Sequence, residues 1–169
     1  MECSSLGNSK LTSAGSLLHN SSNSLISYFS LSMGIASNNI AELGVVRRGL
    51  LLAWDLGFKF IHLEIDSMTI LSWLTTNHDI SPDDIPLFHD CRNLMEHDWT
   101  IQVCHIFYEA NGWADALGKR GNQQQYFLEI YDTCLAFVYV PFVWDMENLG
   151  TTRMCPLKVV MPVVIWTYI

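Results

Sequence analysis

The chain has 169 residues, a length that fits a single domain with room for a tail. Half of the residues are apolar and 15% are charged, so the chain can bury a core and is not a disordered polypeptide. The formal net charge of −8 argues against tight, unassisted binding of nucleic acid, because proteins that bind phosphate backbones usually present a basic face. The same acidic balance is compatible with a carboxylate metal site, and equally with an acidic surface that only promotes solubility.

Cysteine usage and the two ends of the chain predict a soluble intracellular protein. The five cysteines are odd in number and widely spaced, without a C-x-x-C pair, so neither a disulfide framework nor a zinc site is expected. The N-terminus lacks the basic and apolar regions of a signal peptide. The apolar stretch 157–169 contains Lys158 and Pro162 and is shorter than the ~20 residues of a membrane span, so no membrane association is expected. The choice between nucleus and cytoplasm stays open, since no basic cluster marks an import signal.

The first elements are predicted to be a β-hairpin and a helix. The sequence SNSLISYFSLSMG at 22–34 predicts a strand entered from a turn at 20–23, with 14–19 as its hairpin partner. From 39 to 56, apolar residues recur every three or four positions, which predicts a helix. Asn38 or Asn39 is the expected N-cap, and Gly57 is the expected stop.

A strand and two helices are expected next. The residues after Phe60 alternate between two faces of a strand, apolar at Ile61, Leu63 and Ile65 and polar at His62, Glu64 and Asp66. A short helix is predicted over 68–75. A longer helix follows, with Ser81 as its cap and Pro82 in its first turn, and runs to Met95.

The remaining pattern completes an α/β chain. Residues 99–107 are strand-like, and Asn111 then caps a helix that stops near 118–121. The order strand, strand, helix, strand, helix, helix, strand, helix predicts a mixed sheet packed by helices. We expect one domain over 1–121 and a C-terminal tail over 122–169. The aromatic-rich tail is expected to be partly packed on the domain or disordered, with contact to a partner as the alternative.

Three acidic residues stand where predicted elements begin or end. Glu42 and Asp115 fall in the first turns of helices, and Asp66 ends a strand. Helix N-termini favour acidic side chains on their own account, so capping or solvation is the competing explanation for Glu42 and Asp115. Carboxylates brought together from separate elements would suit two Mg²⁺ ions about 4 Å apart, which activate water and orient a scissile phosphate. Spacing alone does not show that the three converge.

The motifs around these residues resemble a known family. They are Ala41-Glu42-Leu43 before the helix RRGLLLAWDLGFK, then Leu63-Glu64-Ile65-Asp66-Ser67, then HIFYEANGWADAL at 105–117. Together, and in this order, they resemble the plant ribonuclease H-like domain. That domain is related to type 1 ribonuclease H and to the nuclease module of non-LTR retrotransposon reverse transcriptases. The resemblance covers roughly residues 2–121.

The resemblance implies a fold, an activity and a set of site residues. The fold would be a five-stranded mixed sheet, with its first strand in the middle, flanked by helices. The activity would be endonucleolytic hydrolysis of the RNA strand in RNA–DNA hybrids, with two Mg²⁺ or Mn²⁺ ions held by four acidic residues. By motif, these fall on Glu42, Asp66 and Asp115, with Glu2 in place of the family's first aspartate. His105 belongs to the plant motif and is expected to have a structural role.

The start of the chain departs from the family pattern. Only Met1 precedes Glu2, so the first strand is expected to be truncated, which would leave hydrogen bonds of both neighbouring strands unmade. Glutamate is also one methylene longer than aspartate, which should weaken binding of Mg²⁺ because that ion demands strict geometry. Three functions therefore stay open: a hybrid ribonuclease, a catalytically impaired domain that binds nucleic acid weakly or serves in interactions, and a fragment without function. The sequence does not indicate protein partners or an oligomeric state.

Overall fold

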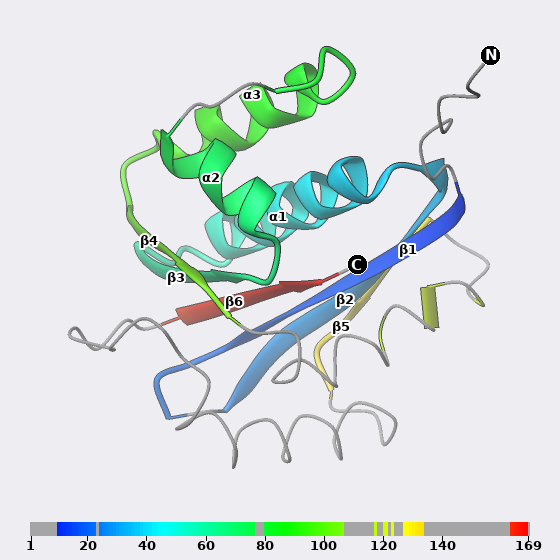
Figure 1. Ribbon diagram of the computed structural model, residues 1–169. Helices are drawn as coiled ribbons and strands as arrows, with labels where there is room; N and C mark the ends of the chain where they lie inside the picture. Colours follow the sequence, from blue (N-terminus) through cyan, green and yellow to red (C-terminus); the bar gives the residue numbers. More distant parts are fainter. Residues whose placement is uncertain are drawn as a thin grey trace, which may run out of the picture.

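The computed structural model describes residues 10–22, 24–76, 80–106, 117, 120–121, 123, 127–133 and 163–168 (Figure 1). In chain order the elements are β1 (Lys10–His19), β2 (Leu25–Ala36), α1 (Asn38–Asp55), β3 (Phe60–Ile65), α2 (Met68–Thr76), α3 (Ile85–Met95), β4 (Thr100–His105), β5 (Leu128–Tyr131) and β6 (Val163–Tyr168). The predicted succession of elements is confirmed through β4. Within these ranges, no helix has the length and apolar character needed to cross a membrane.

The strands form one mixed sheet in the order β4-β3-β6-β1-β2-β5. Strand β3 runs parallel to both β4 and β6, whereas β1 is antiparallel to β6 and β2, and β2 is antiparallel to β5. Helices α1, α2 and α3 lie together over one face of this sheet (Figure 1). The mixed α/β fold is therefore confirmed. The sheet has six strands instead of the expected five, because the segment after residue 121 supplies both β5 and β6.

Strand β6 fills an interior place of the sheet, between β3 and β1. The sequence analysis expected the middle of the sheet to lack most of a strand, and it assigned residues 163–168 to the tail. Their sequence, VVIWTY, is rich in β-branched and aromatic residues, which suits a buried strand. Residues 1–9, which include Glu2, lie outside the described residues, as does most of the predicted tail.

Strands β1 and β2 form the predicted hairpin, and β1 starts four residues earlier than expected, at Lys10. The turn between them is closed by Asn20, whose side-chain oxygen accepts the backbone N–H groups of Ser22 and Ser24, each at 2.9 Å. This is the local hydrogen bonding for which asparagine is favoured in turns. The predicted turn is therefore confirmed.

Helix α1 begins one residue earlier than predicted. Its N-cap is Ser37, which has an extended backbone and whose hydroxyl accepts the N–H of Ile40 at 3.2 Å. The prediction of Asn38 or Asn39 as the cap is wrong, because both residues already belong to the helix. The predicted stop is confirmed: Gly57 has a φ of +79°, a left-handed conformation that favours glycine.

Helix α3 begins later than predicted. Its N-cap is Asp84, and Pro86 occupies the first turn. Residues 81–84 form a separate turn, in which the N–H of Asp84 donates to the carbonyl of Ser81 at 2.9 Å. The prediction of Ser81 as the cap and Pro82 in the first turn is therefore wrong. Ser81 with Pro82 and Asp84 with Pro86 both suit the start of a helix. The helix starts at the second of these, where Asp84 is buried and its Oδ2 atom lies 3.4 Å from the Nδ2 atom of Asn39 in α1.

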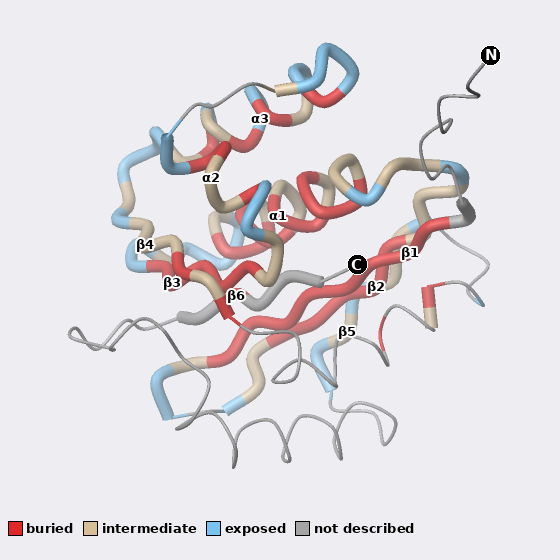
Figure 2. Tube along the Cα trace, viewed as in Figure 1, coloured by how far each residue is buried: buried red, intermediate tan, exposed pale blue. Residues whose placement is uncertain are grey.

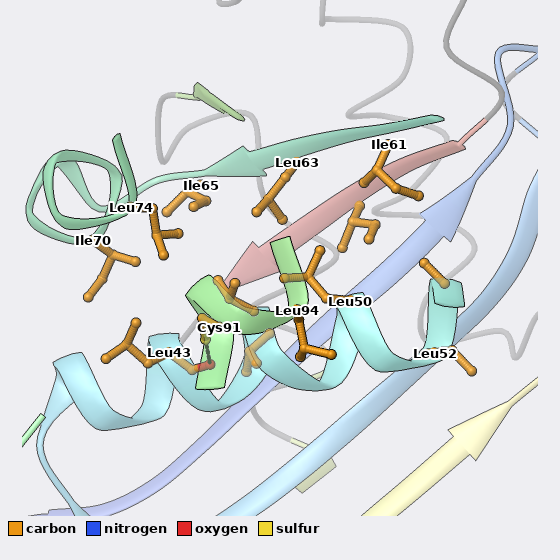
Figure 3. Close-up of a cluster of buried hydrophobic side chains, with 14 of the residues drawn as sticks. Leu43, Leu50, Leu52, Ile61, Leu63, Ile65, Ile70, Leu74, Cys91 and Leu94 are labelled. Carbon is orange, nitrogen blue, oxygen red and sulfur yellow. Dashed lines mark hydrogen bonds between the residues drawn. The ribbon is translucent and has the colours of Figure 1, made fainter. Parts of the chain in front are cut away.

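The main core lies between the sheet and the three helices. Figure 2 shows buried residues along the strands and on the inward sides of the helices. The side chains that meet there come from α1, β3, α2 and α3 (Figure 3): Leu43, Leu50, Leu52, Ile61, Leu63, Ile65, Ile70, Leu74, Cys91 and Leu94. Complete burial of one such side chain stabilises the fold by roughly 1.5–3 kcal/mol. Helix α1 carries Glu42, and β3 ends directly before Asp66. The core packing therefore fixes the positions of these two residues relative to each other.

The opposite face of the sheet is covered as well. A Cβ on Gly15 of β1 would lie 2.4 Å from the Cβ of Leu117, and a Cβ on Gly121 would lie 2.7 Å from the Cβ of Ser13. These two glycines therefore allow direct packing of residues 117–121 on β1. The described residues of that segment are helical, including Gly121, whereas the predicted cap Asn111 lies outside the described residues.

The polar side chains of β3 are buried as well as its apolar ones. His62 and Glu64 are buried, and the His62 Nε2 atom lies 3.1 Å from the Glu64 Oε1 atom. The alternation of apolar and polar residues correctly predicts which residues share a face of the strand. The polar face is nevertheless not exposed to solvent. Interior parallel strands are normally buried on both sides, and β3 has β4 and β6 as parallel neighbours.

Candidate functional site

Glu42 lies in the second turn of α1 and is buried, with 4% of its surface exposed. The predicted position in the first turn is wrong, since the helix starts at Asn38 and has no acidic residue in its first turn. The attraction of a helix N-terminus for an acidic side chain falls off within the first turn. Capping or solvation is therefore a poor explanation for a buried carboxyl group at this position.

Asp66 directly follows β3 and precedes α2. The next residue, Ser67, caps α2 by accepting the N–H of Ile70 at its hydroxyl, at 3.3 Å. Asp66 is half-buried and stands at the carboxyl end of a parallel strand, which is where ligands gather in open α/β sheets. The strand end and the helix cap together fix the backbone on both sides of this carboxylate.

The carboxyl groups of Glu42 and Asp66 meet, although 24 positions separate them in the sequence. Burial is the largest cause that raises the pKa of Glu42, to about 8; a hydrogen bond with the Asp66 side chain and the charge of Asp66 raise it further. The Ser67 hydroxyl and backbone N–H donate to the Glu42 carboxylate and act in the opposite direction. The raised pKa favours the protonated form of Glu42 at neutral pH, hydrogen-bonded to the Asp66 side chain.

This pair fits a divalent cation. Mg²⁺ and Mn²⁺ favour carboxylate oxygens, and a cation between Glu42 and Asp66 would compensate the negative charge that burial and the neighbouring carboxylate otherwise disfavour. In the part of the chain that the structure describes, no basic side chain contributes to the pKa of Glu42. In that same part, no group of three His, Cys, Asp or Glu side chains forms a complete set of metal ligands.

The other two predicted ligands, Asp115 and Glu2, lie outside the described residues. The structure thus brings together two of the four predicted site residues. The assignment of Asp115 and Glu2 to the site stays a prediction.

Two further residues support the carboxylate pair. The His105 ring nitrogen Nε2 donates to the backbone carbonyl of Asp66 at 3.0 Å, in agreement with the structural role expected of this histidine. His105 ends β4 and pairs in register with Ile65 of β3, which puts its ring beside the next residue, Asp66. Sequence reasoning named Ser67 only as part of a motif. The signal for its role was its position directly after a strand-ending aspartate, where a serine caps the next helix.

A separate pocket of about 200 Å³ lies between α1 and α3. It contains the exposed ion pair of Arg47 Nε with Asp90 Oδ2, at 2.9 Å. Neither carboxylate of the pair lines it, so the pocket is not part of the candidate site.

Comparison with known proteins gives the same family from sequence and from structure. The chain is 35% identical over 115 residues to the Arabidopsis thaliana protein named "Putative ribonuclease H protein"; the match covers 68% of this chain and 18% of that protein. The chain therefore spans less than a fifth of the length of this relative.

Two solved structures share the fold. RNase H1 from the archaeon Halobacterium salinarum superposes with a TM-score of 0.61 at 28% identity, over 71% of this chain and 92% of that one. The N-terminal RNase H domain of a Mycobacterium tuberculosis protein, solved as a fusion with maltose-binding protein, gives a TM-score of 0.51 at 18% identity. It covers 68% and 95% of the two chains. Residues 3–121 match the family described as reverse transcriptase-like. The chain belongs to this reverse transcriptase-like family of ribonuclease H-like domains.

Proposed function

We propose that this chain is a metal-dependent endonuclease that hydrolyses the RNA strand of RNA–DNA hybrids. The observation that carries the proposal is the contact between the buried Glu42 and the half-buried Asp66, whose carboxyl groups are hydrogen-bonded at the carboxyl end of β3. The likeness to RNase H1 and to the Arabidopsis protein supports the substrate class.

The proposed site consists of Glu42, Asp66, Asp115 and Glu2. Two bound Mg²⁺ or Mn²⁺ ions would supply activation of water and stabilisation of the departing oxygen. The chain's own part is to hold the ligands. Glu42 and Asp66 present oxygen atoms in a region that burial keeps poorly hydrated. Ser67 donates to the Glu42 carboxylate, and His105 holds the backbone of Asp66.

The test is cleavage of a labelled RNA–DNA hybrid by the purified chain in Mg²⁺ or Mn²⁺. We expect cleavage by the wild-type chain, loss of cleavage in Asp66→Asn and Glu42→Gln, and no loss in Asp98→Asn. Asp98 is the matched control because it is a fully exposed acid beside Lys59, at the other end of β3. Cleavage that survives both substitutions in the pair would remove these residues from the site.

A second candidate is a domain that keeps the fold and binds nucleic acid weakly without turnover. It is favoured by the net charge of −8. Hybrid binding that weakens with salt, without any cleavage, would support this candidate. No binding even at low salt would exclude it.

A further inference from the structure

The C-terminal strand β6 is bonded on both sides within the sheet. Residues 164–168 pair with β1 over Gly15–His19, and residues 163–167 pair with β3 over Ile61–Ile65. Without β6, the sheet divides into a β4-β3 pair and a β1-β2-β5 group, each with an open edge. Unpaired backbone groups at buried edges are costly, so the sheet depends on the segment that fills this place.

Strand β6 is also packed into the core beneath α1. Ile165 is fully buried. A Cβ on Gly49 of α1 would lie 2.9 Å from the Ile165 Cγ2 atom and 3.6 Å from the Oγ atom of Ser16. Real Cβ atoms are essentially never found so close to another heavy atom, so glycine at position 49 allows the helix to lie directly on the strand. The absence of a side chain at position 49 of α1 therefore leaves the space that Ile165 of β6 occupies.

The two members of the carboxylate pair belong to, or directly follow, elements that both contact β6. Glu42 belongs to α1, which packs on β1 and β6, whereas Asp66 follows β3, the other neighbour of β6. The parallel register pairs Thr167 with Ile65, the residue directly before Asp66. Strand β6 thus ends beside the carboxylate pair and joins the parts of the fold that carry each member.

We propose that residues 163–168 are an inserted strand that closes the sheet and thereby brings Glu42 and Asp66 together. The C-terminal segment then supports the site together with the packing of α1 against α2, α3 and the sheet. Strand β6 contains no acidic residue, so it contributes no carboxylate to the site. This inference does not depend on nuclease activity.

The first experiment measures backbone hydrogen exchange in the full chain by mass spectrometry. Backbone amides within 164–167 should exchange at least about a hundredfold more slowly than in an unstructured peptide, because ladders on both sides protect this strand. Exchange at the unstructured rate, while β1 and β2 stay protected from exchange, would overturn the proposal.

The second experiment tests the register with pairs of introduced cysteines. Ser16 and Thr167 are direct partners, as are Leu17 and Trp166, and one of these adjacent pairs has the closer Cα spacing of about 4.5 Å. We expect an intramolecular disulfide in at least one of Ser16→Cys/Thr167→Cys and Leu17→Cys/Trp166→Cys, identified by peptide mapping. The control, Ser16→Cys/Val164→Cys, is three positions out of register and should not cross-link. Cross-links equal in all three, or formed only between two chains, would overturn the proposal.

The third experiment separates β6 from an edge strand. Ile165→Pro removes one N–H and should raise exchange in both 15–19 and 61–65, the partners on the two sides. Ile130→Pro in β5 is the matched control, because β5 pairs only with β2, and it should affect 28–31 without affecting 61–65. Unchanged exchange over 61–65 in Ile165→Pro would contradict the bridging position. If that variant does not fold, the wild-type exchange pattern and the cysteine pairs still decide the question.

Discussion

Glu42 shows how burial changes the meaning of an acidic residue. A carboxyl group on an exposed helix would be ionised and of little consequence. In this protein the burial of Glu42 and the neighbouring Asp66 keep it protonated at neutral pH, unless a cation compensates the second negative charge. The pair is thus a costly polar feature of the described core, and a bound cation would lower that cost.

The raised pKa of Glu42 predicts a stability that falls with rising pH. Between its ordinary value of 4.5 and about 8, the folded chain keeps a proton that the unfolded chain has lost. The folded state therefore binds more protons in this window, and its free energy of unfolding decreases as pH rises, by at most about 1.4 kcal/mol per pH unit. Urea unfolding at pH 5, 6, 7 and 8, without divalent ions, measures the slope.

Glu42→Gln is the control for this pH dependence. Glutamine is close in shape to the protonated side chain and does not titrate. The slope of the variant should be flatter than that of the wild-type chain over the whole window, while the contributions of histidines are common to both. Equal slopes would show that Glu42 is not protonated in the folded state.

Cys91 is predicted to be unreactive in the folded protein. Burial, the largest cause, raises the pKa of its thiol to about 12, and its Sγ atom lies 3.4 Å from the carbonyl oxygen of Leu43, to which it donates. Because the thiolate is the reactive form, alkylation by iodoacetamide at pH 8 should be slower by about a thousandfold or more than in the urea-unfolded chain. Peptide mapping of the labelled cysteines measures this difference. Equal rates in both states would contradict the burial of this side chain.

At the scale of elements, α1 carries two glycines with different surroundings. A Cβ on Gly49 would meet the branched, buried Ile165, whereas a Cβ on Gly44 would lie 2.8 Å from the Cε atom at the flexible end of Met33. Methionine can move its end group at small cost, but a methyl group at the branch of a buried isoleucine cannot move without the strand. The contact of Gly49 with Ile165 therefore limits how closely the helix approaches the sheet, whereas the contact of Gly44 with Met33 does not.

Alanine at these two positions should have opposite effects on stability. Gly44→Ala should stabilise the protein by up to about 1 kcal/mol, the difference in helix propensity. Gly49→Ala should destabilise it by about 1–3 kcal/mol, the usual cost of overpacking. Urea denaturation of both variants measures the free energies of unfolding. In an Ile165→Ala background, which removes Cγ2, Gly49→Ala should lose most of its cost. A stabilising Gly49→Ala in the wild-type background would show that α1 does not rest on β6.

Local patterns predicted the kinds of element well and their starts less well. The strand-like alternation of 60–66 and the glycine stop at Gly57 depend on neighbouring residues, so they could be predicted. The starts of α1 and α3 could not, because several nearby residues are suitable caps. Ser37 caps α1 through a local hydrogen bond with Ile40, whereas Asp84 makes no side-chain capping hydrogen bond and is buried next to Asn39 of another helix.

At the scale of the whole molecule, the net charge of −8 limits how the chain can bind a polyanion. Several of its basic side chains already pair within the protein: Arg47 with Asp90, Lys59 with Asp98 and Arg120 with Glu129. These pairs reduce the positive charge available for phosphate groups. Binding of a hybrid, as proposed, should therefore depend on divalent cations.

The dependence can be measured by fluorescence anisotropy with a labelled RNA–DNA hybrid. Without divalent ions, and at physiological salt, we expect a Kd no tighter than the ~10⁻⁴–10⁻⁶ M typical of non-specific binding. Addition of Ca²⁺, which should bind the carboxylates without supporting cleavage, should tighten binding by the wild-type chain and by Asp98→Asn, but not by Asp66→Asn. Equal tightening in all three would mean that the cation acts away from the pair.

The sequence by itself determined the hairpin, the order of elements through β4 and the family, because these follow from periodicity, turn residues and motifs within short stretches. It also named Glu42 and Asp66, but as separate residues. Only the tertiary structure decided that their carboxyl groups are in contact, and that residues 163–168 lie between β1 and β3. The physical reason is that both results are contacts between distant parts of the chain. A strand of apolar and β-branched residues can pair with the exposed edge of many strands. Its place in the sheet also depends on how its side chains pack in the core, as Ile165 packs against Gly49.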